Sequence, residues 1–191
     1  MFTNNNQDFI NGIKKQQTFV MIKPDGVQRN LIGEIITRIE KVGLKIVEME
    51  MKTARPETIL AHYPSEDKVW LERVGTKTLG TFEELGIDAS QHLPSIDKLE
   101  IGNAVMGYLV DYMTSGPIVV MVVEGNLSVA MMRKMVGATI PITAERGTIR
   151  GDFSVDTPLV ANIECRPVLN LIHASETVEE AQTEIKLWFG K

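Results

Sequence analysis

The chain has 191 residues, of which 43% are hydrophobic and 24% are charged, and its formal net charge is −5. This length suits one globular domain with room for an insertion, and the hydrophobic content suffices for a sizeable core. A negative net charge argues against a general nucleic-acid-binding surface, which would be basic, so we expect no stable nucleic-acid partner.

The composition also bears on the compartment of the protein. Cys165 is the single cysteine, which excludes an intrachain disulfide and favours a reducing compartment. Residues 1–17 are polar and lack the apolar core of a signal peptide, and no apolar run approaches membrane-spanning length. We therefore expect a cytoplasmic protein without a membrane partner, built as a polar tail over residues 1–17 and a single domain over residues 18–191.

The first third of the chain predicts a strand, a helix and a second strand. Residues 18–22 form a continuous apolar run typical of a central strand, and the Lys23-Pro-Asp-Gly26 segment that follows has turn chemistry. Residues 31–42 carry apolar side chains at helical spacing. In residues 47–51 apolar and charged residues alternate, which predicts a half-buried strand with one face in water.

Residues 64–102 differ in character from the segments on either side. A short helix is predicted over residues 56–63, and glycines at positions 75, 80 and 86 then punctuate the chain. We interpret residues 64–102 as several short helices joined by glycines and inserted at the surface of the domain. We expect this insertion to cover a ligand entrance or a subunit edge.

The second half of the chain predicts a helix and a further strand, followed by irregular segments. Residues 100–113 have a helical pattern, and residues 118–123 are the strongest apolar run, as expected for a strand buried on both faces. Asn126 is predicted to cap the next helix. Two irregular loops follow, and the second contains a further insertion over residues 156–165.

A last strand and a last helix close the chain. The apolar residues 171–172 run into His173, and the helix predicted after Ser175 has Glu179 and Glu180 in its first turn, where carboxylates are favoured. The order of the elements predicts an α+β fold, namely a ferredoxin-like four-stranded antiparallel sheet with helices packed on it. We expect these helices to back one face of the sheet.

His173 is the first candidate for chemistry, because its position predicts an imidazole delivered to a pocket edge by a buried strand. Glu184 lies far enough along the following helix to fold back toward this ring. A carboxylate held against an imidazole fixes its tautomer and raises its nucleophilicity. The alternative is a core histidine whose ring is satisfied by a backbone carbonyl, which is the more common role of a lone histidine.

Further polar residues at strand ends, helix ends and loops could form a phosphate site around His173. Together with it, they are Lys23, Tyr63, Arg133, Thr139, Arg150, Asn170, Ser175 and Glu184. No Walker-type glycine loop is present, so arginines and a threonine would hold phosphate oxygens by charge-assisted hydrogen bonds. Lys23 and Tyr63 could then stabilise a phosphoryl group under in-line attack by His173. Alternatively, Lys23 ends its strand in water and Arg133 lies on a solvated helix face.

At these residues the chain resembles the nucleoside diphosphate kinases. The matching segments are residues 18–29 (Thr-Phe-Val-Met-Ile-Lys-Pro-Asp-Gly-Val-Gln-Arg), His62-Tyr63, Ser115-Gly-Pro117, residues 147–153 (Gly-Thr-Ile-Arg-Gly-Asp-Phe), residues 170–175 (Asn-Leu-Ile-His-Ala-Ser) and residues 184–189 (Glu-Ile-Lys-Leu-Trp-Phe). These six ordered segments make the resemblance very specific, and it covers nearly the whole chain apart from the tail and the two insertions.

The resemblance implies a ping-pong exchange that maintains the pools of nucleoside and deoxynucleoside triphosphates. A triphosphate such as ATP or GTP would phosphorylate His173, and a diphosphate would then take the phosphoryl group. Glu184 matches the acid that holds the histidine, with Ser175 beside them. The resemblance also implies Mg²⁺ carried by the nucleotide phosphates, a ferredoxin-like sheet, and a homo-oligomer that is a hexamer or a tetramer.

The same resemblance implies contacts to the nucleotide. Lys23 and Asn170 match the contacts to the sugar hydroxyls, and Lys23 with Tyr63 would also lie near the transferred phosphate. The residues that match the phosphate clamp are Arg133, Thr139 and Arg150.

The chain departs from the family pattern around the base. Val105 stands where the family has an aromatic base platform when Leu109 is aligned, so Val105 and Leu109 are the candidate base contacts. The alternative aromatic substitutes are Trp70, Phe82 and Tyr108. Leu169 replaces an arginine common before the asparagine, and Ala174 replaces a glycine common after the histidine. A site that mainly stacks on bases should accept several of them.

Two other functions fit parts of the pattern. A non-catalytic nucleotide-sensing module on the same fold predicts the loss of His173, Lys23 or Arg150, and all three are present. A histidine phosphatase would place an arginine directly before its catalytic histidine, whereas Ile172 precedes His173.

Overall fold

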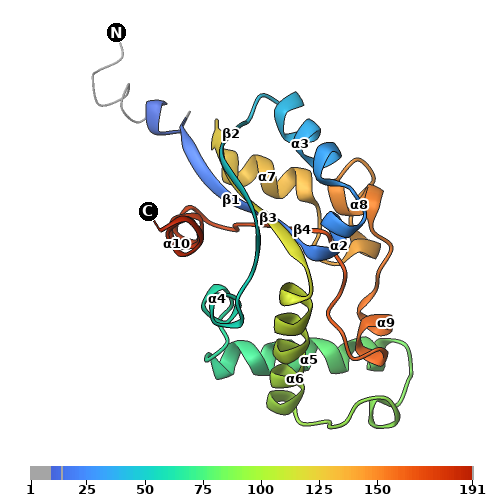
Figure 1. Ribbon diagram of the computed structural model, residues 1–191. Coiled ribbons are helices and arrows are strands. Elements are labelled where there is room, and N and C mark those ends of the chain that lie inside the picture. Colours follow the sequence, from blue (N-terminus) through green and yellow to red (C-terminus); the bar gives the residue numbers. More distant parts are fainter. Residues whose placement is uncertain (1–9, 14, 191) are drawn as a thin grey trace.

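A computed structural model describes residues 10–13 and 15–190 of the chain (Figure 1). Its centre is a four-stranded antiparallel sheet in the order β2-β3-β1-β4. The strands are β1 (Gln16–Ile22), β2 (Lys45–Thr53), β3 (Pro117–Gly125) and β4 (Ile172–Ala174). This order confirms the predicted ferredoxin-like sheet. The polar tail predicted over residues 1–17 lies largely outside the described residues, and β1 begins two residues earlier than expected.

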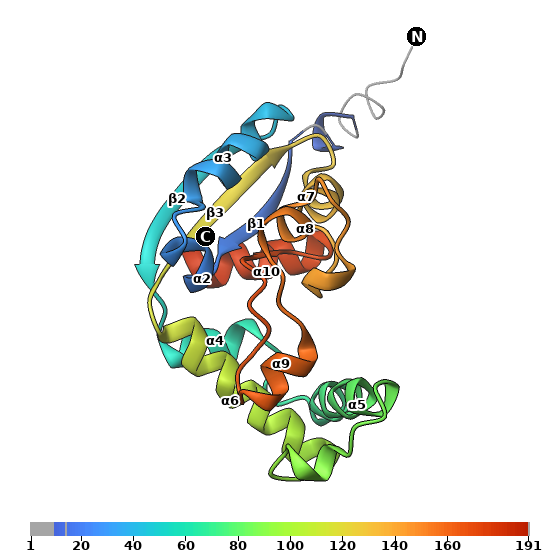
Figure 2. The same cartoon turned by 90° about the vertical axis from the view of Figure 1, so that its right-hand side faces the viewer.

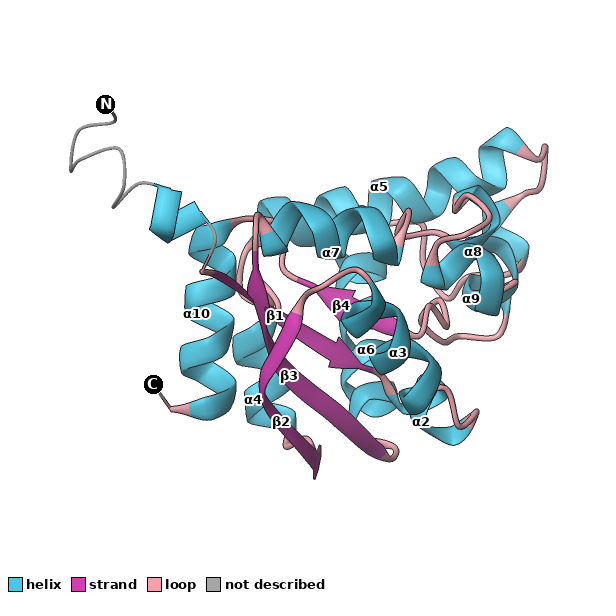
Figure 3. Cartoon of the chain, turned by 90° about the horizontal axis from the view of Figure 1, so that it is seen from above, coloured by secondary structure: helices cyan, strands magenta, loops and turns pink. Residues whose placement is uncertain are grey.

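The helices cover both faces of the sheet, so the expectation of helices on one face is wrong (Figure 3). Alternate residues of β1 point to opposite sides, and two separate apolar cores result. Val20 and Ile22 pack with α3 (Ile32–Lys41), α7 (Ser128–Val136) and α8 (Ile149–Phe153). On the other face, Phe19 and Met21 pack with α4 (Pro56–His62), α6 (Lys98–Thr114) and α10 (Val178–Phe189).

The central strands follow directly from their apolar sequences. Residues 118–123 of β3 are buried, as predicted, because β3 lies between β2 and β1 with a core on each face. The short strand β4 pairs with the end of β1, and this register places His173 opposite Met21. The candidate histidine therefore lies on the sheet next to the strand that ends at Lys23.

The edge strand β2 differs from its prediction in one respect. Its alternating residues do form a strand, but the apolar residues Val47, Met49 and Met51 are 47%, 50% and 60% exposed. A register shift between Ile46 and Glu48 marks a β-bulge in the pairing with β3. An exposed apolar face therefore runs along one edge of the sheet in the single chain.

The first insertion is mainly one long helix, α5 (Lys68–Glu84), followed by a short 3-10 helix (Ala89–Gln91), in place of several short helices joined by glycines. Its Gly75 does not end the helix, because it serves a close crossing with α6. A Cβ atom on Gly75 would lie 2.0 Å from the carbonyl oxygen of Lys98, and one on Gly102 would lie 2.2 Å from that of Leu71. The two helices approach so closely that only glycine fits at these positions.

The second insertion also contains a helix where only a loop was expected. Thr157 caps α9 (Pro158–Ile163) through a hydrogen bond from the backbone N–H of Val160, and Pro158 stands at its first position. This helix packs against α5, so the two insertions meet at one end of the sheet, beside α6 (Figure 2).

Two local predictions about helix starts are wrong. Residues after Lys23 form a short helix, α2 (Pro24–Gln28), in place of a turn. Asn126 does not cap α7. Instead, the first residues of α7 form hydrogen bonds with Gln16 of β1. The side chain of Gln16 accepts a hydrogen bond from the N–H of Val129, and Ser128 donates to the backbone oxygen of Gln16. In the part of the chain that the structure describes, every helix is too short or too polar to cross a membrane.

Candidate active site

His173 sits on β4 with its ring beside Glu184 of α10. Oε1 of Glu184 lies 2.7 Å from Nε2 of His173, and Oε2 accepts a hydrogen bond of 2.6 Å from the Ser175 hydroxyl. The carboxylate is not aligned with the Nε2–H direction, so the contact is electrostatic in this geometry. Because Nε2 faces the acid, Nδ1 is the ring nitrogen that remains for attack on a substrate.

Burial sets the protonation states of this pair. Desolvation, followed by the positive charge of Lys23, lowers the pKa of His173 to about 3. The pKa of Glu184 is raised, mainly because burial disfavours its carboxylate. At neutral pH the imidazole is therefore neutral, which is the form that can act as a nucleophile.

Lys23 and Asn170 form a buried pair at the end of β1. The ammonium group of Lys23 donates a 2.7 Å hydrogen bond to Oδ1 of Asn170, whose amide donates in turn to the backbone oxygen of Thr139 at 2.9 Å. Burial, followed by the charge of Arg150, lowers the pKa of Lys23 to about 7. The structure thus joins three candidate residues that lie far apart in the sequence.

Arg150 of α8 is held beneath this pair by the backbone. Its guanidinium donates to the carbonyl oxygens of Asn170, Gly137 and Ile172 at 3.1, 3.0 and 2.6 Å. Desolvation and the nearby positive charge of Arg133 lower the pKa of Arg150 to about 10. Lys23, Arg150 and Arg133 thus bring positive charges close together, and such a cluster is a favourable place for phosphate oxygens.

Tyr63 follows α4 and adds a hydroxyl to the same region. Burial raises the pKa of its phenol, and the negative charge of Glu184 raises it further. The phenol therefore stays protonated and is available as a hydrogen-bond donor. Among the phosphate candidates, Thr139 is the exposed one, and it is linked to the site through its backbone oxygen.

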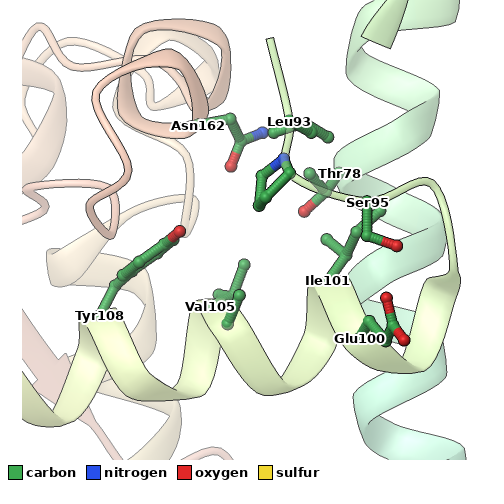
Figure 4. A pocket seen from close by; sticks show the side chains of 10 residues that line it. Thr78, Leu93, Ser95, Glu100, Ile101, Val105, Tyr108 and Asn162 are labelled. Carbon is green, nitrogen blue, oxygen red and sulfur yellow. The ribbon is translucent and has the colours of Figure 1, made fainter. Parts of the chain in front are cut away.

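The candidate base contacts lie apart from this cluster, on α6. Val105 lines a cavity of about 30 Å³, together with Tyr108, Asn162 of α9 and the loop around Leu93 (Figure 4). Leu109 is half-buried and packs against the core between α4, α6 and α10. Both insertions therefore contribute to the walls around Val105, which is not part of an open slot in the single chain.

Two residues near His173 received no role from the sequence. The ring of His62 lies 4.7 Å from that of His173, and its Nδ1 is 3.3 Å from Oε1 of Glu184. Asp25 accepts hydrogen bonds from the Tyr112 hydroxyl and from the N–H groups of Gly26 and Leu171. The position of His62 directly before Tyr63 was a usable signal, whereas the partners of Asp25 are visible only in the folded chain.

One group of described residues has the ligand types of a metal site. Candidate ligand atoms of His62, His173 and Glu184 all lie within 4.8 Å of one another. Two imidazoles and one carboxylate suit zinc and do not suit Mg²⁺, which prefers oxygen ligands. The group therefore does not fit a resident magnesium ion.

Comparisons with known proteins identify the family of the chain. The family model described as "Nucleoside diphosphate kinase" matches residues 16–72 and 98–191. The unmatched residues 73–97 lie inside the first predicted insertion. The nucleoside diphosphate kinase of Pyrobaculum aerophilum is 50% identical over 174 residues, which cover 91% of this chain and 94% of that protein. The corresponding protein of Thermobifida fusca is 37% identical over 174 residues, 91% of this chain and 96% of its own length.

Solved structures give the same result. An NDP kinase from Pyrobaculum aerophilum superposes with a TM-score of 0.86 at 48% identity, covering 92% of this chain and 96% of that one. The nucleoside diphosphate kinase of Borrelia burgdorferi, described as a transition state mimic with bound vanadate and ADP, superposes with a TM-score of 0.73 at 33% identity, covering 93% of this chain and 88% of that one. The chain belongs to the nucleoside diphosphate kinase family.

Proposed function

We propose that this phosphotransferase exchanges phosphoryl groups between nucleotides through His173. In the first half-reaction, Nδ1 of His173 forms a bond to the terminal phosphorus of a triphosphate, and the bond from that phosphorus to the bridging oxygen breaks. The diphosphate leaves with the electron pair of that bond. In the second half-reaction, a terminal phosphate oxygen of a different diphosphate forms a bond to that phosphorus and the Nδ1–P bond breaks. The electron pair of the broken bond returns to Nδ1, which restores the neutral ring.

The observation that carries this proposal is the neutral, buried imidazole whose Nε2 faces a carboxylate beside a cluster of cations. When Nδ1 bonds to phosphorus, positive charge develops on the ring, and Glu184 is placed to stabilise it. Ser175 holds the second carboxylate oxygen by its hydrogen bond. Glu184 and Ser175 thus favour the charged ring that exists only after attack has begun.

The cations are proposed to bind the polyphosphate and to orient it for attack. Lys23 and Tyr63 would contact the transferred phosphoryl group, while Lys23 and Asn170 would also hold the sugar hydroxyls. The residues proposed as the phosphate clamp are Arg133, Thr139 and Arg150. Phosphoryl transfer depends on such positioning and on neutralisation of the phosphate charge.

We propose that the base binds beside Val105 and Leu109, under the segments of the two insertions. The cavity at Val105 is bounded by the loop around Leu93 and by Asn162 of α9. Because Leu93 and Asn162 belong to the two insertions, both insertions would then contact the bound base. The protein does not need its own Mg²⁺ site, since Mg²⁺ would arrive on the nucleotide phosphates.

We further propose that the protein is a cytoplasmic homo-oligomer, either a hexamer or a tetramer. The exposed apolar residues of the edge strand β2 support assembly, because unpaired edge strands with apolar side chains are a common surface for association. The change Met49→Lys should lower the mass measured by light scattering. An unchanged mass would place the subunit contact elsewhere.

A half-reaction tests the central proposal. Purified protein is mixed with γ-labelled ATP and Mg²⁺, with His173→Ala as the control, and is then chased with GDP. We expect an acid-labile, base-stable label on the wild type alone, which GDP discharges as GTP. If nucleotide binds but no label appears, the protein is a nucleotide-sensing module and the phosphohistidine mechanism is wrong.

A further inference from the structure

The ring of His62 lies closer to the proposed nucleophile, His173, than the ring of Phe19 does. Its side chain is 1% exposed, and its ring packs edge-on against His173, with a centroid distance of 4.7 Å and an interplanar angle of 78°. It makes a second edge-on contact with Tyr63 at 4.7 Å and 80°. His62 is thus fixed between two residues of the proposed site.

The Glu184 carboxylate has an imidazole on each side. Oε1 is 2.7 Å from Nε2 of His173 and 3.3 Å from Nδ1 of His62. If both rings presented an N–H to this oxygen, they would compete for it. Whether Glu184 interacts with His173 alone or with both rings therefore depends on which nitrogen of His62 carries the proton.

Trp188 of α10 determines that position. Its indole Nε1–H donates a hydrogen bond to Nδ1 of His62 at 3.3 Å. An indole nitrogen can only donate, so Nδ1 must present a lone pair and the proton of the neutral ring must be on Nε2. Burial lowers the pKa of His62 to about 3, so the ring is neutral at physiological pH.

We propose that the hydrogen bond from Trp188 to His62 is a tautomer lock that reserves the Glu184 carboxylate for His173. His62 and Trp188 are then positioning residues for the proposed phosphoryl acceptor, and this inference rests on the proposed function. With its lone pair toward Oε1, Nδ1 of His62 repels the carboxylate oxygen and cannot donate to it. Of the two imidazoles, only His173 then turns a nitrogen that carries a proton, Nε2, toward this oxygen, and the contact at 2.7 Å is electrostatic.

Loss of the lock has a definite chemical consequence. Without the indole donor, His62 gains stability by moving its proton to Nδ1 and donating to Glu184. The carboxylate then shares its charge between two rings, and the positive charge that develops on His173 during attack is less well stabilised. The first half-reaction should slow, although the phosphate-binding residues are untouched.

The change Trp188→Phe tests this lock. A phenyl ring preserves the stacking of Trp188 on Phe19, whose centroids are 5.9 Å apart at 17°, but it lacks the N–H group. We expect labelling by γ-labelled ATP to slow about tenfold, the lower end of the loss seen when an outer hydrogen bond to a metal-binding histidine is removed. Trp70→Phe, the same change at the other tryptophan of this core, should leave the rate unchanged.

Repeating the Trp188→Phe change in a His62→Phe variant distinguishes the tautomer lock from a packing effect. Phenylalanine has no nitrogen that could compete for Glu184, so adding Trp188→Phe to this variant should not slow labelling further. Equal slowing in both backgrounds would mean that Trp188 acts by packing alone, and would overturn the inference. No slowing by Trp188→Phe in the wild type would overturn it as well.

Nitrogen-15 NMR of the histidine rings gives a readout that does not depend on activity. We expect His62 to carry its proton on Nε2 in the wild type and on Nδ1 in Trp188→Phe. A wild type with Nδ1–H, or a variant that keeps Nε2–H, would contradict the lock even if the wild type is labelled normally. Conversely, failure of the wild type to take up label would disprove the proposed function and leave the tautomer result standing.

Discussion

The surroundings of His173 and the inserted region around α5 and α9 are built in different ways. Near His173, side chains from distant segments are joined by short polar contacts, such as Lys23 with Asn170 and Ser175 with Glu184. In the inserted region, α5 and α6 are joined by close backbone packing at glycines. Side-chain hydrogen bonds between distant segments therefore hold the first region together, and backbone packing holds the second.

The largest effect should come from the charge beside His173. Glu184→Gln keeps the shape of the side chain and removes its negative charge, so it should slow labelling of His173 about a hundredfold, as loss of one preorganised electrostatic group does elsewhere. Rapid-quench measurement of the first half-reaction checks this. A rate within threefold of the wild type would mean that the carboxylate only orients the ring.

The buried ammonium group of Lys23 should make stability depend on pH. Its pKa is lowered to about 7 in the folded chain, so between pH 7 and its ordinary value of 10.5 the unfolded chain binds more protons. The free energy of unfolding should therefore rise with pH through this interval, by up to several kcal/mol. Below pH 7 both states are protonated and this contribution is constant.

Denaturant unfolding at several pH values tests that expectation against Lys23→Met. The variant lacks the titrating group, so the rise above pH 7 should be absent in it. In the wild type, phosphate binding should weaken over the same interval because the cation is lost. A Lys23→Met curve parallel to that of the wild type would assign the rise to another group.

The glycine crossing in the inserted region should respond strongly to a single methyl group. Gly75→Ala places a Cβ 2.0 Å from the carbonyl oxygen of Lys98, so α5 and α6 must separate, at a cost of about 2–3 kcal/mol for overpacking. Gly80 lies in the same helix with nothing within 4 Å of its Cβ position. Gly80→Ala should therefore stabilise the chain by about 0.5–1 kcal/mol.

Thermal unfolding of the two alanine variants measures this difference. Labelling of His173 should be retained in Gly75→Ala wherever the chain is folded, because the crossing contributes no residue to the site. Equal stability of the two variants would show that α5 can shift without cost and that the close approach is not required.

The smallest effect should come from Asn162. Its unpartnered amide nitrogen already lacks a hydrogen bond, so Asn162→Leu should change the free energy of unfolding by less than about 1 kcal/mol. Ser175→Ala, which strips a hydrogen bond from the buried Glu184, should cost about 1–3 kcal/mol. A large cost at Asn162 would instead indicate a water molecule bound in the 30 Å³ cavity, which is roomy enough for one.

The local sequence was enough to predict the strands and to name the candidate residues of the proposed site. Residues 18–22 and 118–123 are apolar enough to require a buried strand wherever they pack, and Thr177 with Glu180 starts α10 through local hydrogen bonds. Some polar residues of the proposed site, such as Lys23 after β1 and Tyr63 after α4, stand at element ends, where a sequence pattern already distinguishes them. These features depend on neighbours a few residues away, which a pattern can show.

Features that depend on distant partners could be recognised only in the folded chain. From the sequence we expected Gly75 to interrupt the helix. In the structure α5 continues through Gly75, where the absence of a side chain lets the backbone of Lys98 in α6 approach. The alternation in β2 predicted that its apolar face would be buried in the core. In the single chain Val47, Met49 and Met51 are exposed. The proton position of His62 depends on a donor 126 residues away in the chain, Trp188, and no local pattern contains that information.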